Sequence, residues 1–148
     1  MKWEIANKLF SNKFEKDSIV KDFLEYSDDF NTIAAFIKNY DKDSEETFFI
    51  EKQNNSYNAR VSSSKGKREI KITDINVKNS IDRIFNELHY KYIDEDGGNG
   101  IYFTLSDTDI KFGHGVAFSK DDKTLDGWGI RLTVTELIKD NWYYYEAK

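Results

Sequence analysis

Two hydrophobic patterns alternate along the chain. Over the first forty residues, in SIVKDFLEY and DDFNTIAAFIKNY, apolar residues recur every three or four positions. That spacing places them on one face of an α-helix. Ser18, a residue type that caps helix N-termini, precedes the first apolar residue, and the polar residues 27–29 separate the two stretches. We therefore predict two amphipathic helices before residue 41.

The period changes to two after the acidic run at residues 41–46. TFFIEKQ, YNARVSS and REIKIT alternate as half-buried strands do, and turn residues at Asn54–Asn55 and Gly66 separate them. Helical spacing then returns, with Asp74 or Asn76 available as a cap, in the set Val77, Ile81, Ile84, Phe85 and Leu88. This part of the chain therefore predicts three strands and one central amphipathic helix.

The last third of the chain is rich in strand patterns. DEDGGNG at residues 94–100 is typical of a turn, and IYFTL, IKFGHGVAF, WGIRLTVT and NWYYYEA are typical of strands. We therefore predict a single α+β domain over residues 1–148. In this domain the N-terminal helices and the central helix accompany a twisted, mostly antiparallel β-sheet.

Composition excludes several classes of protein. The chain of 148 residues has no cysteine, which excludes disulfides and thiolate sites. It has no apolar run long enough to cross a membrane and no signal-peptide pattern, so we expect a cytoplasmic protein with no membrane partner. The absence of proline, with abundant lysine and asparagine, is typical of a bacterial or phage protein.

The net charge of −5 disfavours nucleic acid as a partner, because most nucleic-acid binders depend on cationic contacts to phosphate. Residues 52–71 are locally basic, but they have little aromatic content for stacking on bases. Lysines there are typical of a solvated sheet edge. We therefore expect a protein partner.

His114 is the residue best suited to acid–base chemistry. It lies between two glycines in FGHGVAF, and strand alternation places it on the apolar face with Val116 and Phe118. A buried, hydrogen-bonded histidine is the simpler interpretation. A catalytic His114 in a small metal-independent hydrolase or nuclease is the alternative, since its ordinary pKa suits a general acid or base.

The acidic turns do not have the ligand spacing of calcium loops. An EF-hand loop needs a carboxylate or amide at positions 3 and 5, and glutamate at 12. A loop from Asp94 has Gly98 at position 5 and Leu105 at 12, and one from Asp122 has Thr124 at position 3. Phosphate-binding and metalloenzyme motifs are also absent, so we expect no metal site and no cofactor.

The C-terminal stretch WYYYE is the strongest sign of an interface. In a strand, Trp142 and Tyr144 face one way, and Tyr143 and Tyr145 face the other. One pair can join the core, and the other must be covered or left at the surface. Exposed tyrosine and tryptophan are enriched at binding hot spots, so these four residues are candidate partner-binding residues.

In size, acidity, aromatic content and lack of catalytic motifs, the chain is similar to bacterial immunity and inhibitor proteins. We therefore predict a non-enzymatic protein that neutralises a toxin or effector, such as a nuclease, by covering its basic active site. The acidic contacts would come from clusters that include Asp94, Asp96, Asp121 and Asp122. The alternatives are the hydrolase that uses His114 and a module that binds a small ligand or regulates another protein.

Overall fold

The computed structural model describes residues 15–105 and 113–148. Residues 15–25 are helical, and a turn at Tyr26 leads into α2. The elements that follow are α2 (Ser27–Asn39), β1 (Thr47–Gln53), β2 (Ser56–Ser63), β3 (Gly66–Ile70), α3 (Ile75–Asn86), β4 (Tyr92–Glu95), β5 (Gly100–Thr104), β6 (Gly113–Ser119), β7 (Leu132–Lys139) and β8 (Trp142–Ala147). The predicted α+β class, with helices first and one further helix between groups of strands, is confirmed.

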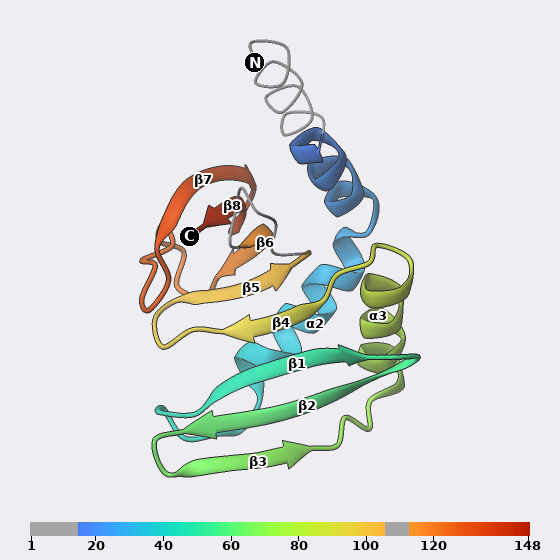
Figure 1. The fold of residues 1–148 in the computed structure, drawn as a ribbon, viewed down its shortest axis with the longest axis vertical. Helices are drawn as coiled ribbons and strands as arrows, with labels where there is room; N and C mark the ends of the chain where they lie inside the picture. The colour runs from blue at the N-terminus through green and yellow to red at the C-terminus, as the bar shows by residue number, and fades with distance from the viewer. Residues whose placement is uncertain (1–14, 106–112) are drawn as a thin grey trace, which may run out of the picture.

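The strands of the described residues form one eight-stranded sheet in the order β3-β2-β1-β4-β5-β6-β8-β7 (Figure 1). Every neighbouring pair is antiparallel. After β3 the chain passes through α3 and returns to the middle of the sheet, where β4 pairs with β1 and then with β5. This return brings the start of β1 beside the end of β4.

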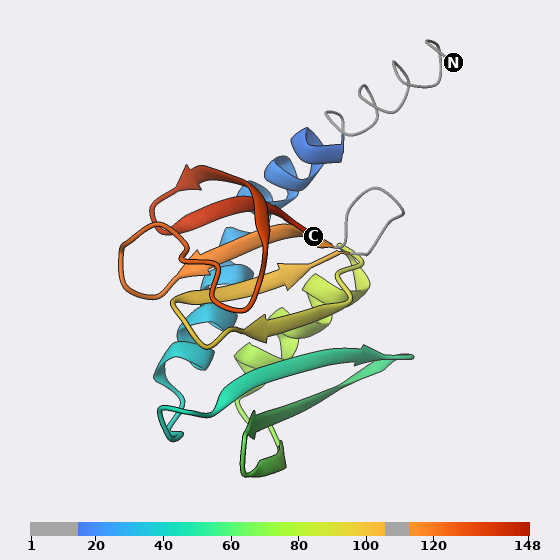
Figure 2. The ribbon, with the colours of Figure 1, turned by 60° about the vertical axis from the view of Figure 1, so that its left-hand side comes forward.

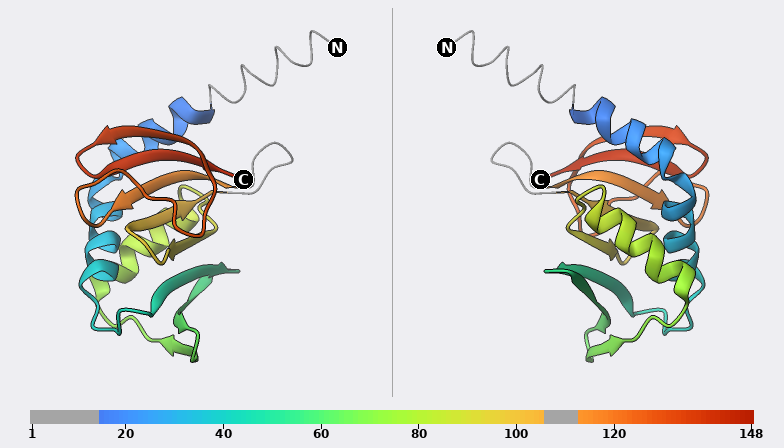
Figure 3. Two further views of the ribbon diagram at one scale, coloured as in Figure 1. Left: turned by 90° about the vertical axis from the view of Figure 1, so that its left-hand side faces the viewer. Right: turned by 90° about the vertical axis from the view of Figure 1, so that its right-hand side faces the viewer.

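The helices lie together on one face of the sheet, as the right-hand view of Figure 3 shows. Their apolar residues and the inward residues of the strands form one core. Its centre is aromatic: the ring of Phe30 lies 5.1 Å from that of Phe103 and 5.8 Å from that of Trp142. The apolar faces predicted for the helices thus pack against the sheet.

The opposite face of the sheet is covered in part by the loop between β6 and β7 (residues 120–131), which folds across it (Figure 2). Leu125 from this loop packs against Tyr102, Ala117 and Tyr145. The sheet therefore has a second, smaller apolar cluster on this side.

Three local predictions need comment. Asp74 caps α3 as predicted, with Oδ1 accepting hydrogen bonds from the backbone N–H groups of Asn76 and Val77. Ser18 does not begin a helix, because residues 15–17 are already helical. The segment 94–100 is not simply a turn, because Asp94 and Glu95 belong to β4.

No helix among the described residues is long and apolar enough to cross a membrane.

Gly115 is required by a close approach between two strands. A Cβ at this position would lie 2.0 Å from the Phe103 carbonyl oxygen on β5, and backbone cannot withdraw as a flexible side chain can. Gly113, on the same strand, would place its Cβ 3.6 Å from the nearest atom, a methyl group of Thr104. Only the second of the glycines that flank His114 therefore has a steric reason to be glycine.

We predict that Gly115→Ala lowers the free energy of unfolding by about 1–3 kcal/mol, the usual cost of overpacking. Gly113→Ala is the matched control and should change it by less than about 1 kcal/mol, since its methyl group makes ordinary contacts. Urea denaturation followed by circular dichroism measures both. Equal stability of the two variants would contradict the steric explanation.

Candidate functional site

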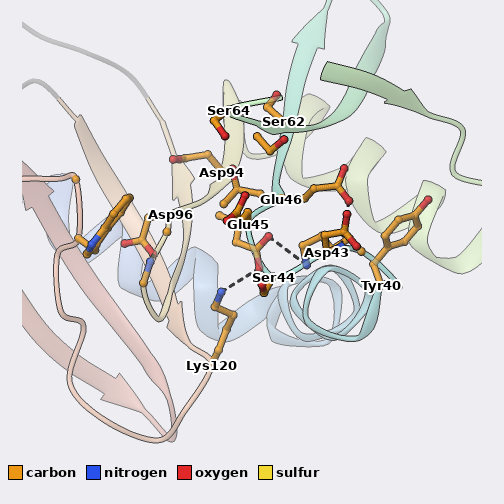
Figure 4. Close-up of a pocket in the computed structure, with 18 of the residues that line it drawn as sticks. Tyr40, Asp43, Ser44, Glu45, Glu46, Ser62, Ser64, Asp94, Asp96 and Lys120 are labelled. Carbon is orange, nitrogen blue, oxygen red and sulfur yellow. Dashed lines mark hydrogen bonds and ion pairs between the residues drawn. The ribbon is translucent and has the colours of Figure 1, made fainter. Parts of the chain in front are cut away.

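A large hollow lies where the start of β1 meets the end of β4. It has a volume of about 980 Å³ and is lined by the loop between α2 and β1, the end of β2, the β4–β5 turn and the loop between β6 and β7. Figure 4 shows acidic side chains from two distant segments around it, Asp43, Glu45 and Glu46 from one and Asp94 and Asp96 from the other. Two of the acidic clusters in the sequence thus share one site.

Glu95 is a buried acidic residue in the lining of the hollow. Its side chain is 4% exposed and forms ion pairs with Lys42 at 3.2 Å and Lys120 at 2.9 Å. Its Oε1 also accepts a hydrogen bond of 3.1 Å from the backbone N–H of Phe48. This carboxylate therefore ties together β1, β4 and the two loops on either side.

Asp94 and Asp96 lack such cationic partners. Asp94 is half-buried, and its carboxylate makes no hydrogen bond or ion pair within residues 15–105 and 113–148. Burial, and then the charge of Asp96, raise the pKa of Asp94 to about 7. Burial also raises the pKa of Asp96, although hydrogen bonds from the backbone N–H groups of Gly98 and Gly100 to its Oδ1 oppose this.

The glycines of the β4–β5 turn allow the loop between β6 and β7 to pack closely on it. A Cβ on Gly97 would lie 2.3 Å from the ring of Trp128, and one on Gly98 would lie 2.4 Å from the carboxylate of Asp126. Asn99 fastens the same contact, because its Oδ1 accepts a hydrogen bond of 2.9 Å from the Asp126 backbone N–H. The glycines and the asparagine of GGNG therefore allow the loop between β6 and β7 to pack against the β4–β5 turn.

Trp128 stands at the surface beside this turn. It is 65% exposed, and the glycines on either side have φ values of 65° and 75°, which L-residues with side chains rarely adopt. From the sequence, Trp128 was predicted as the first residue of the strand WGIRLTVT, and this was wrong, because residues 128–131 belong to the loop before β7. The two flanking glycines were the signal for a loop at this point.

Asp121 and Asp122, also predicted to contact a partner, have local roles in the loop. Asp121 accepts hydrogen bonds from the Asn99 side chain, the Ser119 hydroxyl and the Lys123 backbone N–H. These contacts lower its pKa. Asp122 bonds to the Asn141 side chain. The structure does not bring these two carboxylates to the hollow.

The C-terminal aromatic residues alternate as predicted, but the chain itself covers most of them. Trp142 and Tyr144 belong to the core beneath the helices, and Trp142 donates a hydrogen bond to the Asn31 side chain. Tyr145 is 3% exposed in the second cluster, where its hydroxyl contacts that of Thr104. Only Tyr143 is half-buried, and none of the four residues lines the hollow.

His114 is fully buried. Its Nε2 lies 2.8 Å from the Glu15 carboxylate, and its Nδ1 has no hydrogen-bond partner within the described residues. An ionised carboxylate only accepts hydrogen bonds, so Nε2 carries the proton in this contact. His114 is thus a buried histidine that contacts a carboxylate, which agrees with the simpler interpretation of its sequence.

Within the described parts of the chain, no group of three or more His, Asp or Glu residues is arranged to hold a metal ion. Comparisons with protein families, curated proteins and solved structures found no match to this chain. Function therefore has to be inferred from the residues and geometry of the chain itself.

We predict that Glu95→Gln lowers the free energy of unfolding by about 3 kcal/mol, because two partly buried lysines lose their counter-charge. The control is Glu51→Gln, which breaks the exposed Glu51–Arg60 pair and should cost less than about 1 kcal/mol. Chemical denaturation of both variants measures the difference. A loss of under about 1 kcal/mol in Glu95→Gln would contradict the structural role of this carboxylate.

We also predict that the stability gained by Asp94→Asn depends on pH. The folded-state pKa of about 7 lies above the ordinary 3.8, so the native protein binds more protons than the unfolded chain between these values. The free energy of unfolding of the wild-type protein, relative to that of Asp94→Asn, must therefore fall as pH rises through this range.

Asp94→Asn removes this penalty, so its stability relative to wild type should rise between pH 4 and 7 and then level off. Denaturation at a series of pH values tests this, with Asp82→Asn on the exposed side of α3 as the control. A difference between Asp94→Asn and wild type that does not vary with pH would contradict the raised pKa.

Proposed function

We propose that this protein binds a basic protein partner through the hollow between the α2–β1 loop and the β4–β5 turn, and that it acts as an inhibitor or immunity protein that covers the partner's cationic site. The observation that carries the proposal is the meeting of two acidic clusters, residues 43–46 and 94–96, around one hollow. Concave acidic surfaces attract and orient cationic partners.

The distribution of cations in the hollow supports a basic partner. Three lysines line it, Lys38, Lys42 and Lys120, against six acidic residues. Lys42 and Lys120 are paired with Glu95. Outside this lining, Arg68 pairs with Glu46 at 3.0 Å. These contacts leave Asp43, Glu45, Asp94 and Asp96 without an ion pair among the described residues, and they are the charges that a cationic surface would meet.

An exposed aromatic residue stands beside these charges. Trp128 contacts the β4–β5 turn, and tryptophan is among the residues most enriched at binding hot spots. Acidic residues increase the rate of association with a cationic partner, and a buried aromatic contact slows dissociation. Both are needed for an inhibitor that must remain bound. The hydrolase alternative has no comparable support, because His114 is buried.

The proposal predicts a salt-sensitive complex. Tagged protein should be co-expressed with the product of the adjacent gene and purified at salt concentrations from about 0.1 M to 1 M, over which the Debye length falls from about 10 Å to 3 Å. Retention of that product at low salt and its loss at high salt is the expected result.

Charge reversal locates the surface. Glu45→Lys, at the exposed rim of the hollow, should weaken the complex about fivefold, and Glu25→Lys, on the exposed side of the first helix, should leave it unchanged. Isothermal titration calorimetry with the purified product measures both affinities. If the product is not retained even at low salt, or if Glu25→Lys is the damaging change, the proposal is wrong for this partner.

A further inference from the structure

The sheet has two edge strands, β3 and β7, and the chain protects them differently. An edge strand can pair with a strand of another molecule, and exposed lysines along it discourage such pairing. β3 and the turn before it carry Lys65, Lys67 and Arg68, all of them exposed. β7 has eight residues against five in β3, and its only cation is its last residue, Lys139. The edge at β7 is therefore the less protected of the two.

The outer side of β7 is open to a further strand. β7 forms the end of the sheet (Figure 1) and pairs with β8 along its inner side. In the described parts of the chain, no hydrogen bond joins the backbone of β7 to any segment other than β8. Its outward N–H and C=O groups can therefore form the hydrogen bonds of an added antiparallel strand.

Exposed apolar residues gather beside this edge. A hollow of about 370 Å³ lies between the helix at residues 15–25 and the end of β7, and Leu24 and Leu137 both line it. These leucines are 51% and 62% exposed, and they are two of the four large hydrophobic residues that the described chain exposes. Val20 and Ile138 line the same hollow. Apolar surface gathered beside an unpaired strand is typical of a protein–protein interface.

An irregularity in β7 places two opposite charges on one face of the edge. In a regular strand, Glu136 and Lys139 would point to opposite faces, because they are three positions apart. The register with β8 shifts before Lys139, so that Glu136 lies opposite Tyr144 and Lys139 lies opposite Trp142. Both aromatic residues belong to the core beneath the helices. Glu136 and Lys139 therefore share the helical face, since opposite residues of an antiparallel pair point the same way.

We propose that two copies of this protein pair through antiparallel β7 strands around a two-fold axis between Leu137 and Ile138, so that Glu136 of each copy meets Lys139 of the other. A two-fold axis repeats each contact, so this single surface is complementary to itself and gives two ion pairs. Lys139 has no ion pair among the described residues, and 53% of the Glu136 side chain stays exposed although it pairs with Lys16.

The apolar residues favour the same axis. Leu137 lies next to it, so the leucines of the two copies come together, and the hollows that Leu24 lines approach each other. No residue of β7 lines the acidic hollow between the α2–β1 loop and the β4–β5 turn. Pairing of two copies is thus independent of the proposed function and does not use the residues assigned to the basic partner.

Sedimentation equilibrium of the whole protein over about 5–500 µM tests the proposal. We expect the mass to rise from that of one chain toward that of two, with a dissociation constant of about 10–100 µM, because the contact is small. Leu137→Lys should raise this constant at least about tenfold. The control, Ile75→Lys, changes a residue of α3 that is 61% exposed, and it should leave the constant unchanged.

Exchange of charges tests the register. Lys139→Glu should weaken the dimer about tenfold, because both ion pairs become contacts between like charges. Adding Glu136→Lys to this variant should restore most of the affinity, because both signs are then reversed. Circular dichroism of each variant checks that the fold is kept, which we expect because all the changed side chains are exposed.

Three results would overturn the proposal: a wild-type chain that is still a monomer at about 500 µM, a dimer that Leu137→Lys leaves intact, or a double variant as weak as Lys139→Glu alone. If the chain stays monomeric and Leu137→Lys instead weakens its complex with the product of the adjacent gene, the edge of β7 binds that partner and not a second copy.

Discussion

The arrangement of the hollow depends on the buried carboxylate of Glu95. It joins Lys42 from the loop before β1, Phe48 from β1 itself and Lys120 from the loop after β6. A charge as buried as this one is tolerated only when it is paired and hydrogen-bonded. The three segments therefore cannot move apart independently, and the walls of the hollow are held at a defined separation.

The same carboxylate offsets part of the positive charge in the hollow. Glu95 pairs with both lysines, but its single negative charge does not balance their two positive charges, and Lys120 still acts to lower the pKa of Asp96. Asp94 and Asp96 are left as a partly desolvated pair whose mutual repulsion is relieved either by a proton or by a bound cation. The buried ion cluster around Glu95 thus lies beside acidic residues that have no ion pair among the described residues.

Much of the fold could be predicted from hydrophobic periodicity, because helices and amphipathic strands leave local signals. The strand β4 could not. Its sequence, YIDE, ends in two carboxylates that are typical of a turn, and Glu95 is acceptable inside the sheet only because two lysines from distant segments reach it. Such compensation depends on the tertiary fold and leaves no trace near Glu95 in the sequence.

The site was predictable in parts. The acidic clusters were visible as clusters, but the meeting of residues 43–46 with residues 94–96 follows from the pairing of β1 with β4, which is not a neighbouring pair in the sequence. The alternation of the C-terminal aromatic residues was correct. Their exposure was not predictable, because Tyr145 is covered by a loop whose path depends on contacts with GGNG.

The most direct test of the account is hydrogen–deuterium exchange of this protein, alone and in complex with the product of the neighbouring gene. If the hollow is the interface, amides in the three loops around it, at residues 41–46, 97–99 and 126–130, will exchange more slowly in the complex. Slowed exchange confined to the helices, or to β3 at residues 66–70, with these loops unchanged, would contradict the central claim that the acidic hollow is the binding surface.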